Sequence, residues 1–107
     1  MAAKSKQMSW VGKYVIARCD DTGSYPGVYL GAVIEYDAAA RRIVLARART
    51  AIWWARGVRG LAGLAANGPG TDPATIITSA VATQEAHCVL VLLEVSAASR
   101  ALIEALP

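Results

Sequence analysis

Short β-branched segments separated by turn-rich connections fill the first half of the chain, and this pattern strongly constrains the fold. Residues 13–19 read KYVIARC and run into the turn-rich sequence DDTGSYPG. Residues 27–36 read GVYLGAVIEY, residues 37–40 form a short connection, and residues 42–48 read RIVLARA. Three such segments joined by short turns predict a meander of antiparallel strands.

The second half of the chain predicts two short helices and a further strand. After Gly60 the sequence LAGLAANG is rich in Ala and Leu, and the helix stop NGPG at residues 67–70 closes it. Residues 71–79 are expected to be a loop or an extended segment. Residues 87–95, HCVLVLLEV, are nearly all apolar and predict a central strand covered on both faces. Ser96 suits the N-cap of a C-terminal helix. The predicted class is α+β: a small antiparallel, twisted sheet or partly open barrel with two short helices.

The length of 107 residues fits one domain. Residues 1–12 are predicted to be a flexible N-terminal arm, and residues 13–107 a single α+β domain. No apolar run reaches the roughly 18 residues of a membrane-spanning helix, and the start carries no secretory signal. We therefore expect a cytoplasmic protein without a membrane partner. Two cysteines and one histidine, in no metal-binding spacing, predict neither a metal nor a cofactor.

Positive charge is concentrated in residues 41–59, RRIVLARARTAIWWARGVR. Six of the eleven Lys and Arg residues lie here beside two adjacent tryptophans, and the segment has no acidic residue. Arginine offers a cation and a planar fork of donors, and tryptophan offers a stacking face. These groups bind phosphates and bases, so the segment predicts an anion or nucleotide site. The candidate ligand-binding residues are Trp53 and Trp54 for stacking, Arg49, Arg56 and Arg59 for phosphates, and Tyr29 as an aromatic wall or hydroxyl donor.

Two readings of this segment remain open. Strict alternation would put Ile43, Leu45, Arg47 and Arg49 on one face, which either lines a pocket or emerges into solvent. Residues 51–57 form either a fourth strand or a turn. On a strand, adjacent tryptophans point to opposite faces. One would fill the core, and the other would either stack on a ligand or anchor an oligomer interface.

Catalysis is not indicated. The acidic residues and His87 form no recognisable acid–base arrangement. His87 opens an apolar strand and is interpreted as structural, and the sequence DDTG at residues 20–23 is interpreted as an Asx-type turn. The glycines match no phosphate-binding loop. We therefore expect a protein that is not an enzyme.

Five segments together resemble a family of small, uncharacterised phage and prophage proteins. The family pattern has a Val-Ile-x-Arg strand, a Gly-Val-x-x-Gly strand, an Arg-rich Ile/Leu-Trp-x-Trp motif, a Leu/Ala helix and a Glu-containing apolar strand before a last helix. Thr50 stands where the pattern has a second arginine, and the tyrosine between the tryptophans is missing. The resemblance covers most of residues 13–104 and adds Arg18 to the candidate ligand-binding residues. The matching segments are Val15–Arg18, Gly27–Gly31, Arg49 with Ile52–Trp54 and Gly57, Leu61–Gly68, and Val89–Ile103.

The resemblance implies an accessory role in the cytoplasm of a phage host. Small non-enzymatic phage proteins include oligomers that sequester the nucleotide signals of bacterial immune systems, among them cyclic oligonucleotides and cyclic ADP-ribose isomers. The leading hypothesis is therefore a homo-oligomer that sequesters a phosphate-bearing nucleotide of this kind. A nucleic-acid-binding accessory protein is the second hypothesis, and a structural or protein-interaction module is the third.

Overall fold

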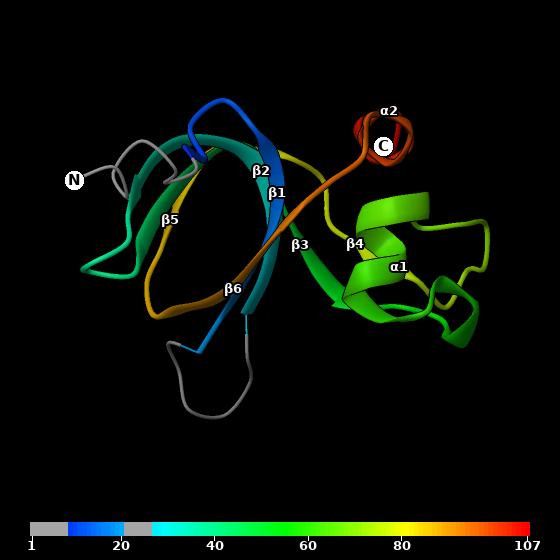
Figure 1. Cartoon of the computed structure of the whole chain (residues 1–107). Helices are drawn as coiled ribbons and strands as arrows, with labels where there is room; N and C mark the ends of the chain where they lie inside the picture. The colour runs from blue at the N-terminus through cyan, green and yellow to red at the C-terminus, as the bar shows by residue number, and fades with distance from the viewer. Residues whose placement is uncertain (1–8, 21–26) are drawn as a thin grey trace.

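Six antiparallel strands form one curved sheet, and two helices lie on one side of it (Figure 1). The computed structural model describes residues 9–20 and 27–107. Residues 1–8 of the expected arm and residues 21–26 of the expected turn lie outside the described residues. The architecture confirms the predicted α+β class. The elements are β1 (Tyr14–Cys19), β2 (Gly27–Asp37), β3 (Arg42–Trp53), a 3₁₀ turn (Arg56–Val58), α1 (Gly60–Asn67), β4 (Ile76–Ile77), β5 (Val81–Ala86), β6 (Val89–Glu94) and α2 (Ala97–Glu104).

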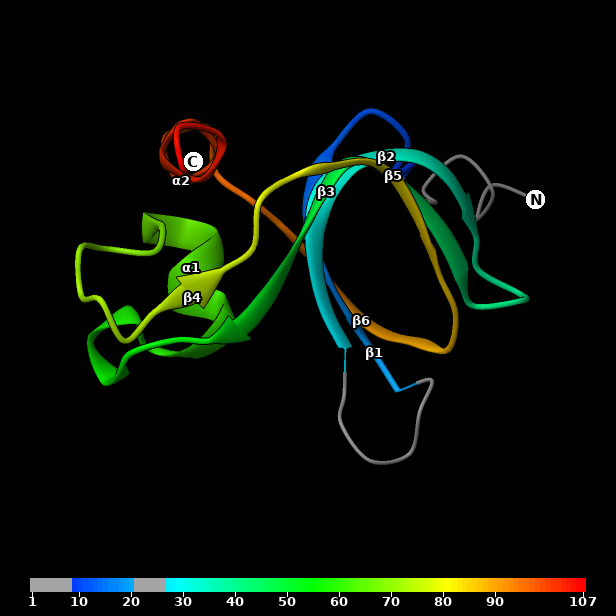
Figure 2. The same ribbon diagram turned by 180° about the vertical axis from the view of Figure 1, so that it is seen from behind.

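The sheet curls without closing. Its strand order is β3-β2-β1-β6, and both β5 and β4 pair with β3. Seen from behind, β3 runs out of the curled part toward the helices, where β4 pairs with its end (Figure 2). Next to β1, the backbone N–H of Gly12 donates to the carbonyl oxygen of Val33 at 2.9 Å. This contact ties the described end of the expected arm to the sheet.

The two faces of the sheet carry separate cores. Side chains alternate along a strand, so β1 contributes to both. The helix-side cluster lies under α1 and α2, and the inner cluster lies within the curl. The helix-side cluster consists of Tyr14, Ile16, Val28, Leu30, Ala51, Val58, Leu64, Ala65, Val95 and Ile103. The inner cluster consists of Val15, Ala17, Cys19, Val33, Ile43, Leu45, Ala48, Ala86 and Val89.

The prediction of a central, doubly covered strand at residues 87–95 is wrong. The segment does form β6, but β6 pairs with β1 along one side, and Leu90 is 48% exposed. Strand β1 occupies the central position instead, between β2 and β6. A short apolar run is compatible with an edge or a centre, and pairing decides between them. Strand β5, which the sequence analysis did not anticipate, is largely exposed.

A bulge in β3 overturns the strict alternation expected for this strand. One residue of β2, Gly31, separates Leu30 from Ala32, whereas two residues of β3 separate their partners Arg49 and Ala46. The extra residue is Arg47, which has a positive φ of 50°. Leu45, before the bulge, therefore packs in the inner cluster. Arg49, after the bulge, is buried outside that cluster.

The helices form where the sequence predicts them and are bonded to each other. The Ser96 hydroxyl accepts a hydrogen bond from the Ser99 N–H at 3.1 Å, which confirms the predicted N-cap of α2. The same hydroxyl donates to the Ala66 carbonyl at 2.8 Å. The buried Ser99 hydroxyl donates to the Leu64 carbonyl at 2.6 Å. These bonds hold α2 against α1 and fix the helical layer beside the end of β3.

Candidate functional site

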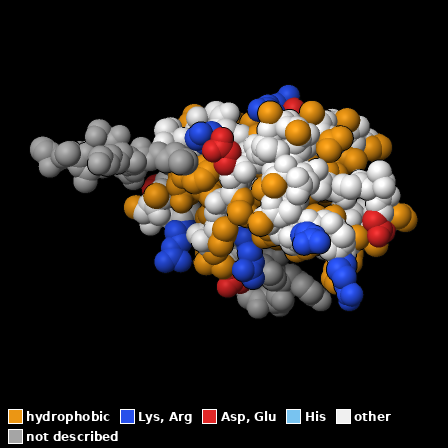
Figure 3. All heavy atoms as spheres, turned by 45° about the vertical axis from the view of Figure 1, so that its right-hand side comes forward, with side chains coloured by type: hydrophobic (Ala, Val, Ile, Leu, Met, Phe, Trp, Pro, Cys, Tyr) orange, Lys and Arg blue, Asp and Glu red, His pale blue; other side chains and the backbone are white. Residues whose placement is uncertain are grey.

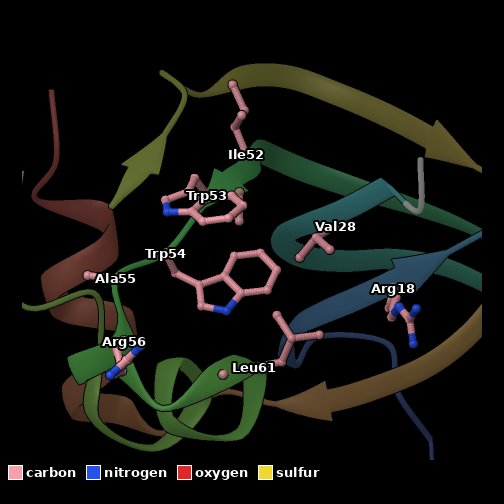
Figure 4. Close-up of a pocket in the computed structure, with 10 residues that line it drawn as sticks. Arg18, Val28, Ile52, Trp53, Trp54, Ala55, Arg56 and Leu61 are labelled. Atoms are coloured by element: carbon pink, nitrogen blue, oxygen red, sulfur yellow. The ribbon is translucent and has the colours of Figure 1, made fainter. Parts of the chain in front are cut away.

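A pocket of about 750 Å³ opens where β3 leaves the curled sheet and meets α1. Figure 4 shows the Trp54 ring in its middle, with Trp53 above, Arg18 on one side and Arg56 on the other. Apolar side chains supply most of the remaining wall. The lining residues are Arg18, Val28, Ala51, Ile52, Trp53, Trp54, Ala55, Arg56, Gly60 and Leu61.

The end of β3 positions the two tryptophans. Trp53 is the last residue of β3 and pairs with Ile76 of β4, and its side chain is 63% exposed. Trp54 follows the strand, is half-buried and packs against the helix-side cluster. The next backbone N–H, that of Ala55, donates to the Thr75 hydroxyl at 2.9 Å. One indole is therefore held by the core while its neighbour stays open to a ligand.

Arg18 and Arg56 bring positive charge to the two sides of the pocket. Arg18 pairs with Val28 across β1 and β2, and Arg56 begins the 3₁₀ turn after β3. Both side chains are exposed. Within residues 9–20 and 27–107, neither guanidinium forms an ion pair. Among the described residues, no carboxylate competes with an anion for either group.

Three other predicted residues lie outside this pocket. Arg49 is buried and donates to backbone oxygens of Thr78, Leu106 and Pro107. Arg59 precedes α1 with a positive φ of 68° and lines a separate hollow beside it. Tyr29 packs against the inner cluster, on the opposite face of β2 from Val28.

The apolar wall of the pocket was not anticipated. Val28, Ala51, Ile52 and Leu61 complete a surface on which the indoles rest. The alternation GVYLG points Val28 and Leu30 to one face, and this signal could have separated Val28 from Tyr29. Nothing in the sequence shows that α1 brings Leu61 to the same place.

The surface around the helical side combines charge with apolar groups. Figure 3 shows Lys and Arg side chains spaced along the lower part of this face, with hydrophobic side chains between them.

In the described parts of the chain, no three His, Cys, Asp or Glu side chains could hold a metal ion together. None of the described helices has the length and apolar character needed to cross a membrane.

Comparison with known proteins identifies a family. No curated protein and no solved structure is detectably similar to the chain. A family model described as a domain of unknown function, DUF6948, matches residues 12–103. This span contains every residue that lines the pocket. The chain therefore belongs to the DUF6948 family of domains of unknown function.

Proposed function

We propose that the protein binds a small phosphate-bearing nucleotide in the pocket at the end of β3, without catalysing a reaction. The observation that supports this most is the combination of two indoles with two guanidinium groups that have no acidic partner among the described residues. A base would stack on the exposed Trp53. Arg18 and Arg56 would hold phosphate oxygens through charge-assisted hydrogen bonds.

The size of the pocket favours a small nucleotide over a long nucleic acid. About 750 Å³ lies within the ~300–1,000 Å³ range typical of small-ligand pockets. The two arginines stand on different sides of the indoles (Figure 4). A ligand with phosphates on more than one side of a base, such as a cyclic oligonucleotide, would use both.

The biological role that we propose is sequestration of a nucleotide immune signal by a phage or prophage accessory protein. The support is the resemblance in the Val15–Arg18, Gly27–Gly31 and Ile52–Trp54 segments, together with the indoles and guanidinium groups that line the pocket. A binder that only sequesters needs affinity and abundance rather than catalytic groups. Cyclic oligonucleotides and cyclic ADP-ribose isomers carry both the anionic and the stackable groups that this pocket would recognise.

A homo-oligomer is part of the proposal. Ile52 and Trp53 of β3 are both more than half exposed at the pocket rim. Ile76 of the neighbouring strand β4 pairs with Trp53. Aromatic and aliphatic groups exposed together are typical of surfaces that another molecule covers. A second copy of the chain over this rim would enclose the ligand.

Native mass spectrometry with a panel of nucleotides tests the proposal. The panel contains cyclic dinucleotides, cyclic trinucleotides and cyclic ADP-ribose isomers. We expect one of them to add a discrete mass at a fixed ratio per oligomer. If no nucleotide is retained while single-stranded nucleic acid binds more tightly with length and more weakly with salt, the nucleic-acid hypothesis replaces this one. Tryptophan emission that changes on dilution but not with nucleotides would support an interaction module instead.

Variants of the pocket locate the site. Trp53→Ala should weaken binding by the ~1–3 kcal/mol typical of one stacked base. Arg18→Gln and Arg56→Gln should each weaken it about tenfold, as expected for the loss of a hydrogen bond between charged groups. Arg41→Gln is the matched control, because Arg41 is exposed and lies outside the pocket. Normal binding by all three pocket variants would refute the assignment.

A further inference from the structure

Tyr14 begins β1, at the other end of the strand from Arg18, and its side chain is buried. The residue is 4% exposed, yet the hydroxyl makes no hydrogen bond to any described residue. No side-chain nitrogen or oxygen in the described residues is both fully buried and unpaired. The hydroxyl therefore has access to the small pocket of about 200 Å³ that Tyr14 lines. A buried tyrosine usually directs its hydroxyl at a partner.

Arg49 lines the same pocket and is held by backbone oxygens. It is 6% exposed, and its hydrogen bonds go to backbone oxygens of Thr78 at 3.2 Å, Leu106 at 2.9 Å and Pro107, the last residue, at 3.2 Å. Its Nε–H makes no hydrogen bond to the described residues. A cation taken out of water is costly, and these backbone oxygens offset that cost in part. Arg49 therefore brings a positive charge and an unused Nε–H donor to the pocket.

Two more arginines, Arg47 and Arg100, form ion pairs with Glu104 at this pocket. Arg47 Nη2 lies 2.9 Å from Glu104 Oε2, and Arg100 Nε lies 3.1 Å from Glu104 Oε1. The Arg100 guanidinium stacks over the Tyr14 ring, 5.0 Å from its centroid. Two guanidinium groups thus share the Glu104 carboxylate, and Arg49 lines the same pocket, so positive side chains outnumber negative ones in this cluster.

All four charges act on the Tyr14 hydroxyl. Burial raises its pKa above the ordinary value of 10.0, and the Glu104 charge adds to this, while Arg49, Arg100 and Arg47 act in the opposite direction. The hydroxyl therefore stays protonated at neutral pH and can donate a hydrogen bond.

We propose that this pocket binds a phosphate-sized oxyanion, with Tyr14, Arg47 and Arg49 as donors and Glu104 as an internal competitor. Glu104 is the last residue of α2, and its carboxylate already occupies the place of an anion between Arg47 and Arg100. An incoming oxyanion would displace that side chain and gain the unused hydroxyl and Nε–H donors. The pocket shares no lining residue with the tryptophan pocket, so the two sites can be tested separately.

Backbone NMR titration at constant ionic strength tests this proposal on the full chain. The probes are inorganic phosphate and glycerol phosphate, with chloride as the control anion. We expect saturable shifts at the amides of Tyr14, Arg47 and Glu104. Tighter binding of inorganic phosphate would identify a free phosphate site, and tighter binding of glycerol phosphate a site for a phosphate ester. Shifts that are absent, equal with chloride or confined to the tryptophan pocket would overturn the proposal.

Three variants test the proposal, because they should change the affinity for phosphate in opposite directions. Tyr14→Phe and Arg47→Gln should each weaken phosphate binding several-fold, whereas Glu104→Gln should tighten it about tenfold because the competing charge is gone. Arg41→Gln serves as the control for general loss of charge. Tyr14→Phe keeps the ring in the core, so the fold is retained. Weaker or unchanged binding by Glu104→Gln, or wild-type binding by the other two variants, would refute the assignment.

Discussion

The arginines of residues 41–59 have different physical roles although they share one segment. Arg42 bridges Glu35 and Glu85 at 3.3 and 2.9 Å across three strands. Arg49 is buried on backbone oxygens, and Arg56 is exposed at a pocket. Composition and spacing could predict that this segment carries the positive charge and the indoles of a site. They could not separate structural from available arginines, because that distinction depends on which acceptors the fold brings to each guanidinium.

Tyr14 leads to a prediction for stability at high pH. The pKa of Tyr14 is raised in the folded protein above its ordinary value of 10.0. At a pH between the unfolded-state and folded-state pKa, the phenol is therefore ionised in the unfolded chain but neutral in the folded one. The free energy of unfolding should therefore fall as pH rises above about 10, and Tyr14→Phe should remove this part of the fall. Denaturant unfolding of both proteins from pH 8 to pH 11 measures it. A wild-type-minus-variant difference that stays flat or rises over this range would contradict the prediction.

At the scale of elements, local sequence signals predicted where the helices and strands lie better than how the strands pair. The β-branched runs, the Asn-Gly stop and the Ser96 cap located β1, β2, α1 and α2. The bulge in β3 has no local signal, since Arg47 is not a residue that favours a positive φ. β5 reads VATQEA, and its largely exposed side chains leave a weak pattern. β6 was identified as a strand but placed at the centre, because an apolar run does not reveal how many neighbours it has.

Gly31 permits the bulge, and this can be tested. A Cβ at this position would lie 2.9 Å from the Ala46 carbonyl oxygen and 3.0 Å from the Leu45 Cβ, so the backbone of β3 would have to move. Gly31→Ala should lower the free energy of unfolding by about 1–3 kcal/mol, as overpacking does. Gly57→Ala is the matched control, because a Cβ there meets no atom within 4 Å. Urea denaturation compares the two, and equal stabilities would show that β3 does not need this close approach.

The whole molecule is organised around β1, which separates two cores and belongs to both. Its Tyr14 and Ile16 lie in the helix-side cluster, and its Val15 and Ala17 lie in the inner cluster. The proposed nucleotide pocket and the proposed oxyanion pocket lie near opposite ends of this strand, at Arg18 and Tyr14. The helical layer therefore packs on the same strand as the curled sheet, and we expect the two to unfold together.

A matched pair of core substitutions tests this cooperativity. Ile16 and Ile43 are both 0% exposed, the first in the helix-side cluster and the second in the inner cluster. Ile16→Val and Ile43→Val should each lower the free energy of unfolding by about 0.5–1.5 kcal/mol. Each variant should still unfold in one transition, with the same midpoint by tryptophan fluorescence and by far-UV circular dichroism. If Ile16→Val shifted the fluorescence transition and left the circular dichroism transition in place, the helical layer would be an independent unit that unfolds without the sheet.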